Sequence, residues 1–217
     1  MPTLREAVAD LSWLRGRGYS DVASLKLVGD RLQLTRRQRG AVARCACSDE
    51  ALASRTVRRQ DVAALAGATV HVDGFNTLIT LERALCGGLV LVGRDRACRD
   101  LAGVHGTWRA VSQTPRGVDL VGRCLAQAGS VFVRWVLDQP VSNSGRLAGM
   151  LREAAEQAGW TWEVEIIASP DPRLATAEGI VVTSDAWILD RCAAWFNLVG
   201  VVMEEAVPDA WTVDLGG

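Results

Sequence analysis

Short apolar segments that end at an aspartate constrain this chain more than any other feature of its sequence. Three such segments are present: residues 70–72 before Asp73, residues 131–137 before Asp138, and residues 180–182 before Thr183-Ser184-Asp185. Continuous β-branched segments of this kind are typical of strands buried in a parallel sheet. Because open α/β sheets bind ligands beyond the carboxyl ends of their strands, the pattern predicts carboxylates gathered at one edge of a sheet.

The order of the expected elements predicts an α/β fold with a mostly parallel sheet. We expect strands at residues 68–72, 89–93, 131–137, 162–167 and 179–183, with a weaker one at 197–202. We expect helices between them at residues 76–86, 116–128, 144–158 and 185–195. Strands that alternate with helices place helices on both faces of the sheet. We therefore predict one α/β domain over residues 63–217.

The first 62 residues predict a small basic helical domain. Apolar residues recur there at helical spacing, and Ser20, Thr35 and Ser48 are expected N-caps. Residues 1–60 hold 12 Lys and Arg against 6 Asp and Glu, whereas the rest of the chain holds 12 against 19. A basic region joined to an acidic one fits a polyanionic partner bound beside a metal site.

Arginines of the expected third helix are the candidate contacts to RNA phosphates, because a guanidinium matches two phosphate oxygens at once. They are Arg36, Arg37, Arg39 and Arg44. A solvated helix face, or attraction to a helix C-terminus, would explain the same arginines without a ligand.

Composition narrows the class of protein. Hydrophobic residues make up 49% of the 217 residues, which excludes a disordered chain. No apolar segment approaches the roughly 20 residues of a membrane helix, and the first residues lack the apolar core of a signal peptide. We therefore expect a cytoplasmic protein that does not bind membranes.

Two of the acidic turns resemble motifs of a known superfamily. Val72-Asp73-Gly74-Phe75-Asn76 resembles the opening motif of the PIN-like nucleases, most closely their NYN branch, and Val181-Val182-Thr183-Ser184-Asp185 resembles their late motif. Between them, Ser169-Pro170-Asp171 is similar to the aspartate that begins the penultimate helix of that superfamily, and Asp138 matches its central acidic position. This resemblance covers about residues 68–200. The whole chain also resembles a prokaryotic family of unknown function.

The resemblance implies a metal-dependent nuclease. PIN-like enzymes use three or four carboxylates to bind one or two Mg²⁺ or Mn²⁺ ions and hydrolyse RNA. The implied catalytic metal ligands are Asp73, Asp138, Asp171 and Asp185, with Asn76, Thr183 and Ser184 orienting ligands or water. PIN-like enzymes also commonly carry an acid in an early helix, where only Glu82 is available here.

Each candidate also has a structural explanation. Asp73, Asp171 and Asp185 could cap the helices that follow them, and Asp138 could shape a turn. Asp95 follows the segment 89–93 and is a further possible metal ligand.

Other polar and aromatic residues are weaker candidates. Ser142 and Ser144 open a helix that could receive a phosphate or could simply be capped by them. Trp108 is the expected stacking residue for a base, Trp187 an expected core residue, and His105 a candidate substrate contact.

The leading hypothesis is therefore a metal-dependent ribonuclease with a basic RNA-binding front. One alternative is a non-catalytic RNA-binding module with a degenerate PIN-like site, and another is a small-molecule phosphatase or phosphotransferase. The sequence leaves open an oligomer and an inhibitory protein partner, and no feature indicates the latter.

Overall fold

A six-stranded parallel sheet forms the centre of the protein in the computed structural model, which describes residues 1–101 and 108–216. Its strands lie side by side in the order β1 (Arg59–Gln60), β8 (Trp195–Phe196), β7 (Ile180–Val182), β2 (Thr69–Asp73), β5 (Phe132–Asp138) and β6 (Trp162–Ile167). All neighbouring pairs are parallel. The expected α/β fold is thus confirmed.

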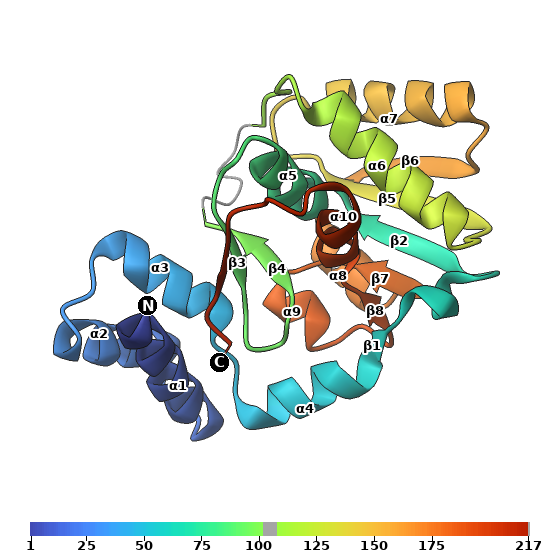
Figure 1. The fold of residues 1–217 in the computed structure, drawn as a ribbon. Helices are drawn as coiled ribbons and strands as arrows, with labels where there is room; N and C mark the ends of the chain where they lie inside the picture. The colour runs from blue at the N-terminus through green and yellow to red at the C-terminus, as the bar shows by residue number, and fades with distance from the viewer. Residues whose placement is uncertain (102–107, 217) are drawn as a thin grey trace.

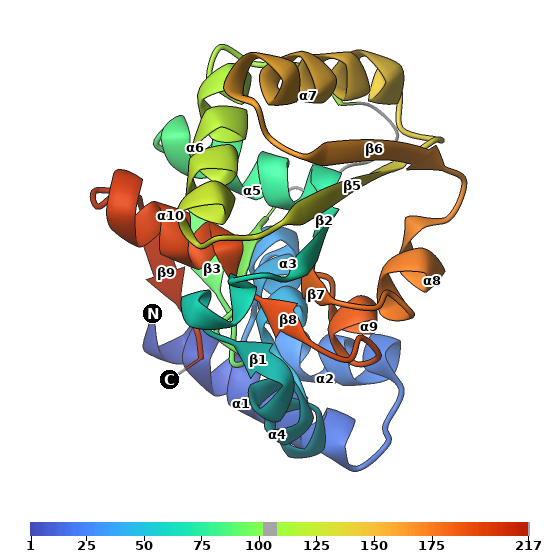
Figure 2. The ribbon, with the colours of Figure 1, turned by 90° about the vertical axis from the view of Figure 1, so that its right-hand side faces the viewer.

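Helices cover both faces of this sheet (Figures 1 and 2). On one face lie α5 (Gly74–Leu85), α6 (Thr114–Gln127), α7 (Ser144–Ala158) and α10 (Leu198–Ala206). On the other lie the short helices α8 (Pro170–Ala175) and α9 (Ala186–Leu189). Each face of the sheet carries its own apolar core, and alternate residues of β5 contribute to each. Val133 and Trp135 belong to the larger core, and Val136 belongs to the smaller one. This alternation is the period of two expected for strands buried on both faces.

A second, three-stranded sheet joins the N-terminal helices to the rest of the molecule. It consists of β4 (Cys98–Asp100), β3 (Val90–Val92) and β9 (Thr212–Asp214), with β3 antiparallel to β4 and parallel to β9. The helices α1 (Pro2–Gly16), α2 (Asp21–Arg31) and α3 (Arg36–Cys45) pack against it. Leu11 of α1 and Val42 of α3 share one apolar cluster with Leu91 and Leu215. The segment expected at 89–93 is therefore a strand, but it lies outside the main sheet.

The helix α4 (Asp49–Arg58) connects the N-terminal helices to β1 of the main sheet, and a single 3₁₀ turn, η1 (Val62–Leu65), then leads from β1 to β2. Two expected caps are confirmed. The Thr35 hydroxyl accepts a hydrogen bond from the backbone N–H of Gln38, and the Gln38 side-chain oxygen accepts one from the backbone N–H of Thr35. The Ser48 hydroxyl accepts one from the backbone N–H of Ala51. Ser20 precedes α2 but makes no capping bond with its side chain.

Two expectations near the end of the chain are wrong. The weak strand at 197–202 is part of the helix α10, and the helix expected over 185–195 is the single turn α9 followed by β8. A short apolar run such as Val199–Met203 fits a buried helix as well as a buried strand, so periodicity could not decide. Across the described part of the chain, no helix has the length and apolar character needed to cross a membrane.

Candidate functional site

Four of the predicted aspartates follow four adjacent strands, β7, β2, β5 and β6, at their carboxyl ends. In that order they are Asp185, Asp73, Asp138 and Asp171. Since the strands are parallel, all four side chains start from the same edge of the sheet. The strand order reverses between β2 and β7, because β5 and β6 lie on one side of β2 while β7 and β8 lie on the other. Asp73 and Asp185 flank this reversal, where α/β sheets bind their ligands.

Asp73 is buried and held by two neighbouring side chains. The Asn76 amide donates a hydrogen bond of 2.7 Å to Asp73 Oδ2, and the Thr183 hydroxyl donates another of 2.7 Å to the same oxygen. Asp73 Oδ1 accepts none from the residues that the structure describes. Although α5 begins at the next residue, the Asp73 side chain does not cap it. The expected orienting role of Asn76 and Thr183 toward this carboxylate thus has a geometric basis.

Burial raises the pKa of Asp73 to about 6, because it penalises the charged form more than the two hydrogen bonds favour it. The negative charges of Asp185 and Asp171 raise this pKa further. Asp73 is therefore close enough to both for their charges to repel. A carboxyl group in such a place gains from any cation that joins it.

Asp185 caps a helix with one of its two carboxylate oxygens. Its Oδ1 accepts hydrogen bonds from the backbone N–H groups of Trp187 (2.8 Å) and Ile188 (3.1 Å), which open α9. The cap explanation is thus correct for Asp185, but it leaves Oδ2 without a bond to any described residue. The Asp185 backbone N–H also donates to the Thr183 hydroxyl (3.1 Å), so Thr183 links the two aspartates.

Asp171 and Asp138 lie on the other side of Asp73. Asp171 is exposed in the first turn of α8, and its pKa is raised by burial and then by the charges of Asp185 and Asp138. Asp138 is half-buried, and desolvation raises its pKa. Its Oδ1 is enclosed and accepts no hydrogen bond within the described residues. Both aspartates line a hollow of about 360 Å³ together with Ser169 and Trp187.

Gly74 allows α5 to begin directly against β5. A Cβ atom at this position would lie 2.3 Å from Leu137 Cδ2 and 3.3 Å from the carbonyl oxygen of Val136. Only glycine therefore fits between the end of β2 and the neighbouring strand without displacement of Leu137. The Asp-Gly pair of the sequence motif is a packing requirement as well as a turn.

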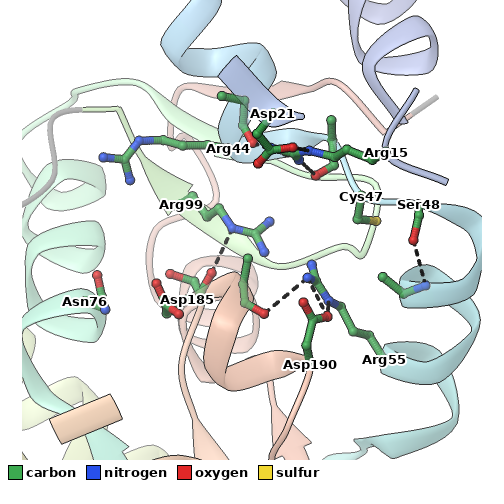
Figure 3. A pocket seen from close by; sticks show the side chains of 15 residues that line it. Arg15, Asp21, Arg44, Cys47, Ser48, Arg55, Asn76, Arg99, Asp185 and Asp190 are labelled. Carbon is green, nitrogen blue, oxygen red and sulfur yellow. Dashed lines mark hydrogen bonds and ion pairs between the residues drawn. The ribbon is translucent and has the colours of Figure 1, made fainter. Parts of the chain in front are cut away.

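A larger cavity of about 380 Å³ separates the acidic edge from the N-terminal helices (Figure 3). Asn76, Ser184 and Asp185 line it on the sheet side, and its cationic lining residues are Arg15, Arg44, Arg55 and Arg99. Three of these guanidinium groups already have partners. Arg44, from α3, makes no hydrogen bond or ion pair with any residue described, so its charge is available to a ligand.

The partners of the other three arginines are aspartates and backbone carbonyls. Arg15 binds Asp21 (2.9 Å) and the carbonyl oxygens of Ala43 and Ala46. Arg55 and Arg99 are almost fully buried and converge on Asp95.

Asp95 forms the centre of a buried ion-pair network. Its Oδ2 lies 2.6 Å from a guanidinium nitrogen of Arg55 and 2.6 Å from one of Arg99, and its Oδ1 is 2.8 Å from a second nitrogen of Arg99. Although burial raises the pKa of Asp95, the two guanidinium groups outweigh it and hold the pKa at about 2. Both oxygens are thus occupied, and the structure gives Asp95 the role of an ion-pair partner.

This network positions the loop that carries Asp185. Arg99 Nε donates to the carbonyl of Ser184 (2.8 Å), and Arg55 donates to the carbonyl of Ala186 (3.2 Å). Arg55 and Arg99 are functional candidates that the sequence did not indicate, because each lies far along the chain from the loop it holds. A buried arginine in a basic helix has no sequence signature of its own.

The remaining basic and polar candidates fall into different places. Arg36 and Arg37 are exposed on α3, whereas Arg39 is committed to the carbonyl of Leu34 (3.0 Å) and to Asp30 (2.8 Å). Ser144 is buried at the start of α7, and Ser142 is exposed ahead of it. Neither serine lines the cavity or the hollow beside the aspartates.

Two aromatic expectations are wrong. Trp108 is buried in the main core, where its ring centroid lies 6.1 Å from that of Phe75, so it offers no face to a base. Trp187 was expected in the core but is 42% exposed. Glu82 is buried and accepts a hydrogen bond from Thr114, away from the aspartates, and His105 lies outside the described residues.

Within residues 1–101 and 108–216, no group of three or more His, Cys, Asp or Glu side chains is arranged as a metal site. The four aspartates share an edge and repel one another, but they do not converge on a common point. Asp73 and Asp185 are the two that combine an unpaired oxygen with a place at the reversal of strand order.

Comparison with known proteins places the chain in a family. Residues 62–201 match the model of a domain of unknown function (DUF5616). The chain belongs to this family. Residues 3–58 match a second model, a protein of unknown function (DUF434), and three residues separate the two matches just before η1. None of these descriptions states an activity.

One relative extends over nearly the whole chain of this DUF5616 member. It is the uncharacterized protein MJ0935 of Methanocaldococcus jannaschii, which is 28% identical over 187 residues, covering 86% of this chain and 89% of that protein. No solved structure matches the chain.

Proposed function

We propose that this chain is a metal-dependent ribonuclease that hydrolyses phosphodiester bonds of RNA, with Mg²⁺ or Mn²⁺ held at the acidic edge of the sheet. The observation that carries the proposal is the pair Asp73 and Asp185. Each presents one unpaired oxygen at the reversal of strand order, and the pKa of Asp73 is raised by burial first and then by the charge of Asp185.

The donor chemistry of this pair fits a hard divalent cation. Mg²⁺ prefers carboxylate oxygens, keeps several of its waters, and is commonly bound through one or two carboxylates together with substrate phosphates. Two carboxylates at the same edge of the sheet are therefore enough, and the charge of Asp171 also acts on Asp73. Such an ion would supply a water of lowered pKa and would stabilise negative charge on the phosphate oxygens.

The chain's own residues prepare the site. Asn76 and Thr183 fix the Asp73 carboxylate by binding Oδ2, which leaves Oδ1 without a hydrogen bond to any described residue. The Thr183 hydroxyl also holds the backbone at Asp185, and Arg55 and Arg99 hold the carbonyls on either side of that residue. Preorganisation of this kind spares the side chains a costly rearrangement when a substrate binds.

Arg44 supports a nucleic-acid substrate. Its unpaired guanidinium shares a cavity with Asn76 and Asp185, so one phosphate could meet the cation site while the next meets this arginine. Arg36 and Arg37 extend the same helix with exposed positive charge. The sequence resemblance to PIN-like nucleases favours RNA over DNA.

A calorimetric titration with Mn²⁺ tests the proposal. We expect the wild-type protein to bind Mn²⁺ and the double variant Asp73→Asn/Asp185→Asn to bind it at least about tenfold more weakly, because each aspartate supplies a ligand oxygen. Asparagine is as good a helix cap as aspartate, so the change at position 185 preserves the start of α9. The double variant Asp119→Asn/Asp209→Asn removes the same charge elsewhere and is the matched control.

Cleavage of labelled single-stranded RNA in Mn²⁺ then completes the test. The proposal requires that the control variant cleaves the RNA and that Asp73→Asn/Asp185→Asn does not. The circular dichroism spectrum of Asp73→Asn/Asp185→Asn should be unchanged, which shows that it is folded. Equal Mn²⁺ affinity and equal cleavage in both double variants would remove the two aspartates from the mechanism and the proposal with them.

A non-catalytic RNA-binding module is the alternative, and one observation favours it: in the part of the chain that the structure describes, the acids do not form a three-ligand group. It predicts RNA binding that persists in the Asp73→Asn/Asp185→Asn variant and no turnover in any variant. The same titration and cleavage assays separate the two functions.

A further inference from the structure

Trp187 is an exposed aromatic residue beside the acidic edge. It belongs to α9, in which Ile188 and Leu189 are fully buried, yet its own side chain is 42% exposed. It lines the hollow of about 360 Å³ that also contains Asp138 and Asp171. Burying an exposed indole against a flat ligand would recover apolar area that α9 leaves in water.

Arg191 packs its guanidinium group against the Trp187 indole ring. Its guanidinium lies 4.0 Å from the centre of the Trp187 ring, and it donates a hydrogen bond of 3.0 Å to the Trp187 carbonyl oxygen. Arg191 is exposed and has no carboxylate partner among the residues described. The pair therefore combines a preoriented aromatic ring with a positive charge that no aspartate neutralises.

Between them these two side chains match the two parts of a nucleotide. A base can stack on the indole, since every base has a π-face, and a phosphate can pair with the guanidinium. The prolines Pro170 and Pro172 add apolar surface to the lining of the hollow. In a duplex the faces of the bases are covered by their neighbours, so this chemistry selects an unpaired base.

We propose that Trp187 and Arg191 form a binding site for one nucleotide of single-stranded nucleic acid, next to the carboxylates Asp171 and Asp185. The proposal rests on the nuclease function above and adds the form of its substrate: a flexible single strand. Arg191 also offsets the repulsion that a phosphate would meet at the acidic edge.

The chain provides a matched control at its other end. Trp13 of α1 is 57% exposed and has Arg17 at 4.1 Å from its ring centre, which is the same Trp–Arg spacing in sequence and nearly the same geometry. Trp13 lines neither the cavity nor the hollow beside the aspartates. A variant at Trp13 therefore shows what the loss of an exposed Trp–Arg pair does away from the proposed site.

The test is fluorescence anisotropy with a labelled single-stranded RNA of about 12 nucleotides, a length within the usual site sizes. EDTA is present, so that binding is measured without metal or cleavage. We expect Trp187→Ala to weaken binding about tenfold, Trp187→Phe to restore most of it, and Trp13→Ala to leave it unchanged. Arg191→Gln should lower the salt dependence of binding by about one phosphate contact.

Three results would overturn the site. They are equal affinity of Trp187→Ala and the wild type, an equal loss in Trp13→Ala, and equal binding of the same sequence as a duplex. None of these results would overturn the nuclease proposal, because the anisotropy assay contains no metal. The Mn²⁺ titration tests that proposal separately. No binding of this RNA by the wild type would overturn the nucleotide site and would likewise leave the nuclease proposal to the Mn²⁺ titration and the cleavage assay.

Discussion

The buried carboxyl group of Asp73 makes the stability of the protein depend on pH. Burial raises its pKa to about 6 in the folded chain, against 3.8 for the same group in water. The folded state therefore binds a proton more tightly than the unfolded state does. Stability conferred by the protonated group is fully present below pH 3.8 and is lost as the pH rises through about 6.

Replacement of this carboxylate should thus stabilise the protein at high pH. Asp73→Asn keeps an oxygen that can accept from Asn76 and Thr183, and we expect it to raise the free energy of unfolding by about 3 kcal/mol at pH 8. The gain should shrink as the pH falls below 6. Urea unfolding from pH 5 to pH 8 measures it, with Asp209→Asn as control. A pH-independent difference would contradict the burial of a charge here.

Sequence could identify Asp73 and Asp185 because a strand end is a local property. The ion pairing of Asp95 could not be predicted in the same way. Its partner Arg55 is 40 positions away and comes from a helix of the N-terminal region. Trp108 and Trp187 show the same limit. Whether a tryptophan faces the core or water depends on how its element docks, which its neighbours in sequence do not record.

At the scale of elements, close contact between α5 and β5 sets the position of Asp73. The apolar runs predicted β2, β5, β6 and β7 to within a residue or two. Of these strands, β2 and β7 are the most continuously buried, as expected for the middle of a parallel sheet. The two-residue strands β1 and β8 left no periodic signal, and β9 closes the second sheet from a segment of no distinct pattern. The arrangement of the acidic edge was thus predictable, and the second sheet was not.

Gly74→Ala should disturb this contact. The added Cβ would press on Leu137, and overpacking of a core of this kind costs about 1–3 kcal/mol of unfolding free energy. Gly149→Ala in α7 meets nothing within 4 Å and should instead stabilise by about 1 kcal/mol. Chemical denaturation measures both. The cost of Gly74→Ala should fall in a Leu137→Ala background, and equal costs in both backgrounds would show that the two residues do not compete for space.

At the scale of the whole molecule, the N-terminal helices share a core with the second sheet. Leu11, Val42, Leu91 and Leu215 belong to one cluster, so the helices that match DUF434 are packed against strands of the region that follows them. Arg55 adds a buried ion pair across the same junction.

This shared core predicts a single unfolding transition. Leu11→Ala removes a fully buried side chain and should cost about 2–5 kcal/mol, moving the far-ultraviolet circular dichroism and tryptophan fluorescence transitions together. Val57→Ala, at a position 83% exposed, is the control. Two transitions, of which Leu11→Ala moved only one, would show that residues 1–62 form the independent domain expected from the sequence.

The pairing of α1 with β9 also sets an order of events during synthesis. Arg5 donates a hydrogen bond to the carbonyl of Asp214, a residue 209 positions later, and Leu215 completes the cluster beneath α1. At translation rates of about 5–20 residues per second, the first helix waits on the order of 10 to 40 s for its partners. For that interval α1 packs on α2 and α3 but lacks its contacts with Asp214 and Leu215, so the part of its apolar face that they cover lies open to other chains. The basic N-terminal region is also made before the aspartates at the edge of the main sheet.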